Sequence, residues 1–470
     1  MITKTDFLTY LDSPRHLWAI KHNKLDKKDI DIYLQHLLEQ GYQVEELAID
    51  YIKKYILPQY STSQDDLHIQ QTQVDGIYEA RVDILIKNEH TDKWDMYEIK
   101  SSSKVDNKHR YDATFQYLVF DKWYDIENIY ILHLDKDYER QGEISLPDLF
   151  LCENINQDVE NLKDEVLRLR LDAFKVSETN DVNSTLACIR PKQCPCPSLC
   201  HPNLPDYSIY DINRITQNKS KVRDLEALGI IDIYDIPEDF ELSDIQRKQV
   251  NVAQSKEAYI DREEIEEMFE DLKYPLYFLD YETFNPAIPI FDGYRPFDHI
   301  TFQYSLHVLD RDGNLTHYEY LHTDRTDPIP HLLSSLKDHI KDDDGSIVVW
   351  NKSFEGSRNK RMGEIYPEFE DFCEDMNDQL FDLMDVFKDQ KYDDPKFKGS
   401  YSIKSVLPVL VPELSYKELN VQNGAMAMAS WYDFVFKDGK NMDIKNDLLR
   451  YCELDTLAMV RVFEELKKVV

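Results

Sequence analysis

The chain has 470 residues, of which 42% are hydrophobic and 12% aromatic, and this composition excludes a disordered protein. Its length allows two or three domains. The net charge of −35 disfavours tight, non-specific binding to duplex nucleic acid, which usually requires a basic face. The charge is compatible with an acidic site that holds Mg²⁺ or Mn²⁺, and with a basic protein partner.

The N-terminal sequence lacks the long apolar core of a signal peptide, and no apolar run approaches membrane-spanning length. We therefore expect a cytoplasmic protein without a membrane partner. Three of the seven cysteines are predicted to be ordinary core thiols, namely Cys152, Cys373 and Cys452.

Residues 1–205 are predicted to form a first domain. Helical signals begin at Thr5 and continue in an apolar pattern to Trp18, and a second helix is expected from Asp29 to Tyr55. Three strand-like segments then follow, at 80–86, 94–100 and 129–135.

Residues 206–265 are predicted to form a helical connector. The stretch 221–240 has two short helical segments around Gly229, where a missing side chain lets the backbone bend tightly. This pattern is similar to a helix-hairpin-helix turn, which can bind phosphate through backbone N–H groups. A connector that only packs domains together explains the pattern equally well.

Residues 266–470 are predicted to form a third domain with an α/β layer architecture, because early strands are followed by helices. The expected strands are 275–284, 299–310, 315–323 and 346–351, and the last helix is expected over 446–469.

Four acids and a tyrosine in this third domain form an ordered set. Asp280 and Glu282 are two apart in an apolar strand, so both point to one side, where a divalent cation would offset their repulsion and lost hydration. A surface strand with solvated acids is the alternative, but the flanking residues are too apolar for it. Glu355 follows a buried strand, while Tyr451 and Asp455 share one helix face.

This set resembles the DEDD exonucleases that carry tyrosine in the last motif. The resemblance implies a ribonuclease-H-like domain in which Asp280, Glu282, Glu355 and Asp455 hold two Mg²⁺ or Mn²⁺ ions and Tyr451 positions the attacking water. The chain has Glu355 where the second motif of the family has Asp.

The first domain carries a second candidate site. Asp83, Glu98 and Lys100 lie on two predicted strands, so that two acids could bind a metal beside an ammonium group. The pattern resembles the PD-(D/E)xK nuclease core, a restriction-endonuclease-like fold, and Gln116-Tyr117 looks like an element of the RecB-type members. Candidates for a further upstream acid or histidine are Glu45, Glu46 and the weaker His36, which is expected on a helix surface.

Four cysteines cluster at the end of this domain: Cys188, Cys194, Cys196 and Cys200. In a chain without an export signal this indicates a metal site before it indicates disulfides. Resemblance to RecB-type nucleases implies a [4Fe–4S] cluster, but Ser13 occupies the position where that family has its N-terminal cysteine. Zn²⁺ and a metal-free cluster of packed thiols are the alternatives, and Cys194 and Cys196 are close in sequence for zinc.

Two further segments have competing interpretations. Ser400, Ser402 and Lys404 could contact phosphate oxygens, or their loop could cap a helix. Asp382 and Asp385 could look catalytic, but Asp382 is predicted to anchor a helix start.

The whole chain resembles the bacterial family catalogued as domain of unknown function 2779, through stretches such as YEIKSSSKV, FLDYETFNPAIP, WNKSFEGSRNKR and LLRYCELDTLAMV. The resemblance implies a RecB-like nuclease fused to a ribonuclease-H-like exonuclease. We expect a metal-dependent nuclease that acts on single-stranded or frayed DNA rather than RNA, in repair or anti-phage defence. The alternative is a degenerate nuclease fold that binds nucleic acid or a basic protein as a scaffold.

Overall fold

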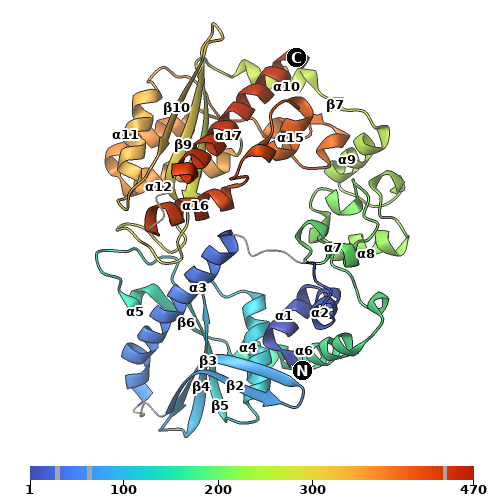
Figure 1. Ribbon diagram of the computed structural model, residues 1–470, viewed down its shortest axis with the longest axis vertical. Coiled ribbons are helices and arrows are strands. Elements are labelled where there is room, and N and C mark those ends of the chain that lie inside the picture. Colours follow the sequence, from blue (N-terminus) through green and yellow to red (C-terminus); the bar gives the residue numbers. More distant parts are fainter. Residues whose placement is uncertain (27–31, 61–65, 438–441) are drawn as a thin grey trace. The chain divides into compact units, whose positions relative to one another are not determined.

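The computed structural model describes residues 1–26, 32–60, 66–437 and 442–470 (Figure 1). The chain divides into two compact units. Unit 1 contains residues 1–203 and 286–298, and unit 2 contains 204–285 and 299–470. The segment predicted as a separate connector is thus part of unit 2. Both units are mixtures of helices and mixed sheets, which confirms the predicted α/β class.

Unit 1 is built on a six-stranded sheet in which the order is β1-β3-β4-β5-β6 and β2 also pairs with β3. β4 and β5 run parallel, and β4 is antiparallel to β3. The three strands predicted in this domain are confirmed as β3, β4 and β5. The strands are β1 (Ile2–Thr3), β2 (Leu67–Asp75), β3 (Tyr78–Asn88), β4 (Lys93–Lys100), β5 (Ile126–Leu134) and β6 (Phe150–Asn154).

Apolar side chains of successive strand residues point to opposite faces of this sheet, so both faces are apolar and helices cover both. Met96 packs in one core with helices α1, α4 and α6, while Tyr97 packs in another with α3. The single N-terminal helix expected to reach Trp18 is two helices, since Pro14 cannot continue the first one. The helices are α1 (Lys4–Asp12), α2 (Pro14–Lys21), α3 (Ile32–Tyr51), α4 (Asn107–Phe120), α5 (Leu146–Leu149), α6 (Asn156–Glu178) and α7 (Pro197–Cys200).

The predicted helix 29–55 corresponds to α3 followed by a π-helical turn, Ile52–Ile56, and its first three predicted residues lie outside the described residues. Segment 286–298 belongs to unit 1 through its hydrogen bonds: the Ala287 N–H donates to Gln40 Oε1 at 2.6 Å, and Arg140 donates to the carbonyls of Pro289 and Ile290.

Unit 2 has a five-stranded sheet in the order β10-β9-β8-β11-β12. The central strand β8 is antiparallel to β9 and parallel to β11. All four strands predicted here are confirmed with small shifts at their ends. The strands are β8 (Leu276–Phe284), β9 (Ile300–Leu309), β10 (Leu315–Leu321), β11 (Ile347–Val349) and β12 (Leu380–Asp382).

The long C-terminal helix α17 packs along β8 and β9, with α16 beside it (Figure 1). Its apolar residues form a buried stripe that includes Leu448, Val462 and Phe463. The helices of this part are α11 (Ile329–His339), α12 (Lys352–Ile365), α13 (Glu370–Asp378), α14 (Asp385–Lys388), α15 (Ile403–Leu410), α16 (Gly424–Phe436) and α17 (Met442–Val469).

The stretch 204–270 contains α8 (Lys219–Ala227), α9 (Asp244–Ser255), β7 (Tyr259–Ile260) and α10 (Arg262–Glu270). Gly229 has φ +76° and ends α8, as expected for a tight turn. The second helical segment of the predicted hairpin is one 3₁₀ turn, Ile233–Asp235.

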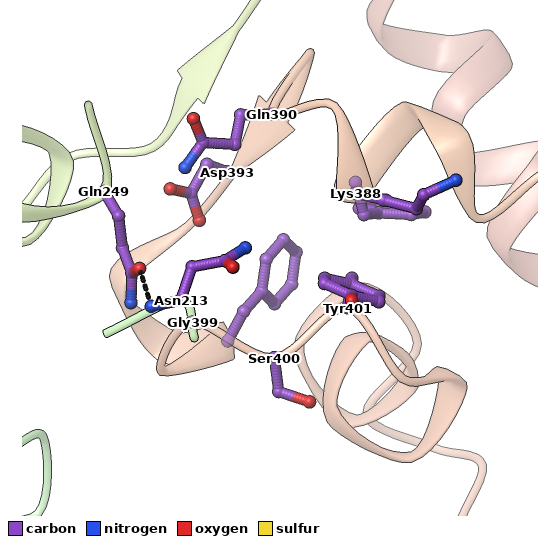
Figure 2. Close-up of a pocket in the computed structure, with 10 residues that line it drawn as sticks. Asn213, Gln249, Lys388, Gln390, Asp393, Gly399, Ser400 and Tyr401 are labelled. Carbon is purple, nitrogen blue, oxygen red and sulfur yellow. Dashed lines mark hydrogen bonds between the residues drawn. The ribbon is translucent and has the colours of Figure 1, made fainter. Parts of the chain in front are cut away.

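A small pocket lies between this stretch and residues 387–401 of unit 2 (Figure 2). Gln249 Oε1 accepts from the Asn213 N–H at 2.8 Å, and Gln249 Nε2 donates to the Asp211 carbonyl at 3.0 Å. The Gln249 amide lies against Gly399, which has φ +68°. A Cβ at residue 399 would come within 2.1 Å of Gln249 Nε2, so only glycine fits there.

Candidate functional site

The centre of the unit 2 sheet carries an acidic cluster. Asp280 and Glu282 project from β8 on one side, and Asp455 projects from α17, which packs against that strand. One carboxylate oxygen from each of these three acids lies within 4.8 Å of the others. Residues 175 positions apart in the chain are thus within reach of one cation.

Glu355, in the first turn of α12, lies near this cluster but is not among the three acids whose oxygens lie within 4.8 Å of one another. Its charge is among those that raise the pKa of Asp280, and its Oε2 atom is buried without a hydrogen-bond partner. The start of α12 is held by Asp382, whose Oδ2 accepts from the Lys352 N–H at 2.9 Å. This confirms the predicted role of Asp382, whereas Asp385 forms a surface ion pair with Lys388.

Three polar side chains surround Asp455. The Tyr416 hydroxyl donates to Asp455 Oδ1 at 2.6 Å, and the Tyr451 hydroxyl lies close enough to help lower the pKa of the same carboxylate. Lys404 Nζ in turn donates to the Tyr451 oxygen at 3.0 Å. The structure therefore brings Lys404 to the cluster, while Ser400 and Ser402 hydrogen-bond to one another at an exposed loop. Tyr416 was missed, because its contact joins residues 39 apart with no shared periodicity.

Burial raises the pKa of all four acids, and repulsion by neighbouring acids of the cluster adds to it for Asp280 and Glu282. Burial raises the pKa of Glu355 to about 8. Burial and the charge of Asp455 raise the pKa of Glu282 to about 8, and burial raises that of Asp455 to about 6 against the Tyr416 hydrogen bond. The pKa of Asp280 lies well above its usual range for the same reasons. Three converging carboxylates, with the orphaned oxygen of Glu355 nearby, suit hard divalent cations, which take oxygen ligands.

Unit 1 gathers a different cluster under α4, in which acids and lysines alternate. Glu98 is buried on β4, and its Oε1 accepts from both Lys100 and Lys4 at 2.7 Å. Lys100 Nζ also donates to Asp112 Oδ2 at 2.5 Å. Burial raises the pKa of Glu98, but the two ammonium groups outweigh it and lower the pKa to about 2.

The structure also brings Asp83 and Gln116 to this cluster. Burial, followed by the charge of Glu98, raises the pKa of Asp83 to about 8. Gln116 Nε2 donates to Asp112 Oδ1 at 2.8 Å. Asp112 was missed, although its four-residue spacing from Gln116 on a helix was a usable signal. Lys4 lies 94 residues from its partner Glu98, and the sequence gives no sign of that contact.

Glu45 and Glu46 do not join this cluster. They lie on α3, which packs against Tyr97 on the sheet face opposite Glu98, and Glu45 accepts from Gln70. His36, expected on a helix surface, is buried.

The four clustered cysteines are buried together with Ala19 of α2. Cys196 Sγ lies 3.8 Å from Cys200 Sγ, and His16 Nε2 lies 3.3 Å from Cys194 Sγ. His16 and these three cysteines each offer a donor atom within 4.8 Å of the others. Of the three predicted core thiols, Cys373 and Cys452 are buried, whereas Cys152 is exposed, because it lies on the edge strand β6.

In the part of the chain that the structure describes, none of the helices combines the length and apolarity needed to cross a bilayer.

Residues 277–402 match the protein family described as "Domain of unknown function (DUF2779)", which supports the resemblance to that family. Uncharacterized protein UU173 of Ureaplasma parvum serovar 3 is 29% identical over 226 residues, which are 43% of this chain and 33% of that protein. The uncharacterized MG366 homolog of Mycoplasma pneumoniae is 28% identical over 42% of this chain and 32% of its own length. The chain thus spans about a third of these relatives. The solved structure of SSO0001 aligns with 43% of this chain and 87% of its own, at 14% identity and a TM-score of 0.26.

Proposed function

We propose that unit 2 is a metal-dependent nuclease of the ribonuclease-H-like DEDD type that removes nucleotides from the 3′ end of single-stranded or frayed DNA. The observation that carries the proposal is the convergence of Asp280, Glu282 and Asp455 within reach of one cation, with Glu355 beside them. A purely structural core would not collect four carboxylates that repel one another and lose hydration.

Each residue has a distinct role in this proposal. The four acids would hold Mg²⁺ or Mn²⁺, ions that when bound activate water and stabilise charge on the leaving oxygen. Lys404 donates to the Tyr451 oxygen, which leaves the hydroxyl proton of Tyr451 free to point toward Asp455 or a water molecule beside it. Tyr451 would therefore orient the nucleophile, and Lys404 would hold Tyr451 and face a substrate phosphate.

Unit 1 supports a second proposed nuclease site of the PD-(D/E)xK type. Glu98 Oε2 is buried without a hydrogen-bond partner. Asp83 lies close enough to Glu98 for the Glu98 charge to raise the pKa of Asp83. These two acids would hold one divalent cation, and Lys100 would stabilise charge on the phosphate. Two lysines already compensate Glu98, so unit 1 has less need of a cation than unit 2.

The test uses the full chain with 3′-labelled and 5′-labelled single-stranded DNA and RNA, in Mn²⁺ or in EDTA. We expect Mn²⁺-dependent release of nucleotides from 3′ ends, more from DNA than from RNA, and loss of this release in Asp280→Asn. Asp312→Asn is the matched control, because Asp312 is an exposed turn residue of the same unit. Exonuclease activity that persists in Asp280→Asn would contradict the assignment of this site.

The contribution of unit 1 is separated by Lys100→Ala, with the exposed Lys108 changed in the same way as its control. Activity that falls only in Lys100→Ala would move the catalytic role to unit 1. Binding of DNA without cleavage by the wild type in either metal would favour the scaffold alternative instead.

A further inference from the structure

The cysteine cluster of unit 1 has an unexpected neighbour, His16 of helix α2. We propose that His16, Cys194, Cys196 and Cys200 bind a single Zn²⁺ ion with tetrahedral geometry. The proposal stands apart from the nuclease sites, since none of these four residues belongs to them.

Two of the distances between donor atoms are close to the edges of one tetrahedron. Zinc bonds sulfur at about 2.3 Å and nitrogen at about 2.0–2.1 Å, which places neighbouring sulfur ligands about 3.8 Å apart and a nitrogen about 3.6 Å from a sulfur. Cys196 and Cys200 have sulfur atoms 3.8 Å apart, and His16 Nε2 is 3.3 Å from Cys194 Sγ. All four donor atoms lie within 4.8 Å of one another.

The same distances do not fit the [4Fe–4S] cluster that the resemblance to RecB-type nucleases implies. In such a cluster each thiolate binds a different iron at the corner of a cube, so the sulfur ligands stand farther apart than those around one ion. The residue in the family's cysteine position also faces elsewhere: Ser13 is buried, and its hydroxyl donates to the Leu186 carbonyl at 3.2 Å.

Local structure explains how closely spaced cysteines can share an ion. Cys194 follows the 3₁₀ turn Pro191–Gln193, and Cys196 precedes helix α7, which ends at Cys200. The sulfur atoms of Cys194 and Cys196 lie within 4.8 Å of one another, so the single residue between them is no obstacle to a shared ion. Cys188 lies next to this set, in contact with Cys194 and Cys200, but it is not among the four donors within 4.8 Å of one another, and its sulfur is 3.3 Å from His201 Nε2.

A zinc ion here would join the N-terminus of unit 1 to its last segment. Helix α2 otherwise holds residues 185–186 through Arg15, which donates to the Thr185 carbonyl, and through Ser13. Because α1 precedes α2 directly and carries Lys4, the ion would also stabilise the helix pair that supplies Lys4 to Glu98.

The experiment measures zinc, iron and acid-labile sulfide in the purified full chain, followed by zinc K-edge X-ray absorption. We expect about one zinc per chain, no sulfide, and three sulfur ligands with one nitrogen ligand. Iron with sulfide, four sulfur ligands, or a protein that holds no zinc and binds no stoichiometric Co²⁺ would each overturn the proposal.

Variants then test the ligand set. His16→Ala should lose most of the zinc, whereas His16→Cys should retain it and give Co²⁺ a stronger sulfur-to-metal absorption. Cys188→Ser and the exposed Cys152→Ser should both keep the ion. Zinc retained in His16→Ala, or lost in Cys188→Ser, would show that the ligand set is wrong.

Discussion

Replacing Glu355 by glutamine should have opposite effects on stability and on activity. Glu355 is 3% exposed, and burial raises its pKa from 4.5 to about 8. An acid with a raised pKa in the folded state binds more protons when folded, so its contribution to stability is full below pH 4.5 and is lost as the pH rises through about 8. At 1.36 kcal/mol per pH unit, the loss reaches at most about 5 kcal/mol.

Glutamine is neutral at every pH and avoids this loss. In EDTA, Glu355→Gln should therefore stabilise unit 2 by under about 1 kcal/mol at pH 4.5 and by at most about 5 kcal/mol at pH 8.5. In Mn²⁺ the order should reverse, because the wild type gains stability from the bound ion and the variant loses a ligand. The variant should also lose the proposed nuclease activity.

Hydrogen exchange of the β8 and β11 amides, with variant and wild type compared at each pH, measures this effect because the intrinsic exchange rates cancel. Glu364→Gln on the same helix is the control, since Glu364 is half-exposed and pairs with Lys360 and Arg361, so this change should alter stability by less than about 0.5 kcal/mol. A Glu355→Gln variant that is destabilised in EDTA, or whose gain does not depend on pH, would refute the reasoning.

Three further predictions follow from single contacts. Tyr451→Phe should keep the fold and lower the rate of Mn²⁺-dependent cleavage by about 10²–10⁴-fold, because it removes the hydroxyl that Lys404 holds. An unchanged rate in a nuclease assay would exclude a role of Tyr451 in orienting the nucleophile. Lys100→Met should lower the unfolding free energy of unit 1 by about 3–5 kcal/mol, because the buried carboxylates of Glu98 and Asp112 lose one ammonium partner. Urea denaturation measures this loss, and it should show little change in the control Lys108→Met. Gly399→Ala should lower the melting temperature of unit 2 more than Gly313→Ala does. Both glycines have positive φ, but only a Cβ at residue 399 would collide with neighbouring atoms. Equal shifts in melting temperature would contradict this prediction.

Much of the secondary structure could be predicted because it depends on local patterns. The apolar runs at 275–284 and 299–310 read directly as β8 and β9, and the pattern at 446–469 reads as α17. The errors occurred where a single residue interrupts a pattern, as Pro14 does, or where burial depends on the edge of a sheet, as for Cys152.

The sequence by itself determined which side chains share one side of an element: Asp280 with Glu282 on a strand, and Tyr451 with Asp455 on a helix, because these spacings follow from backbone geometry. Only the tertiary structure decided which of these sides face one another. It paired Asp455 with Tyr416, and it brought Lys4 and His16 to partners 94 and 178 residues away. Periodicity describes the direction of a side chain relative to its own element, whereas packing of whole elements sets what that side chain meets.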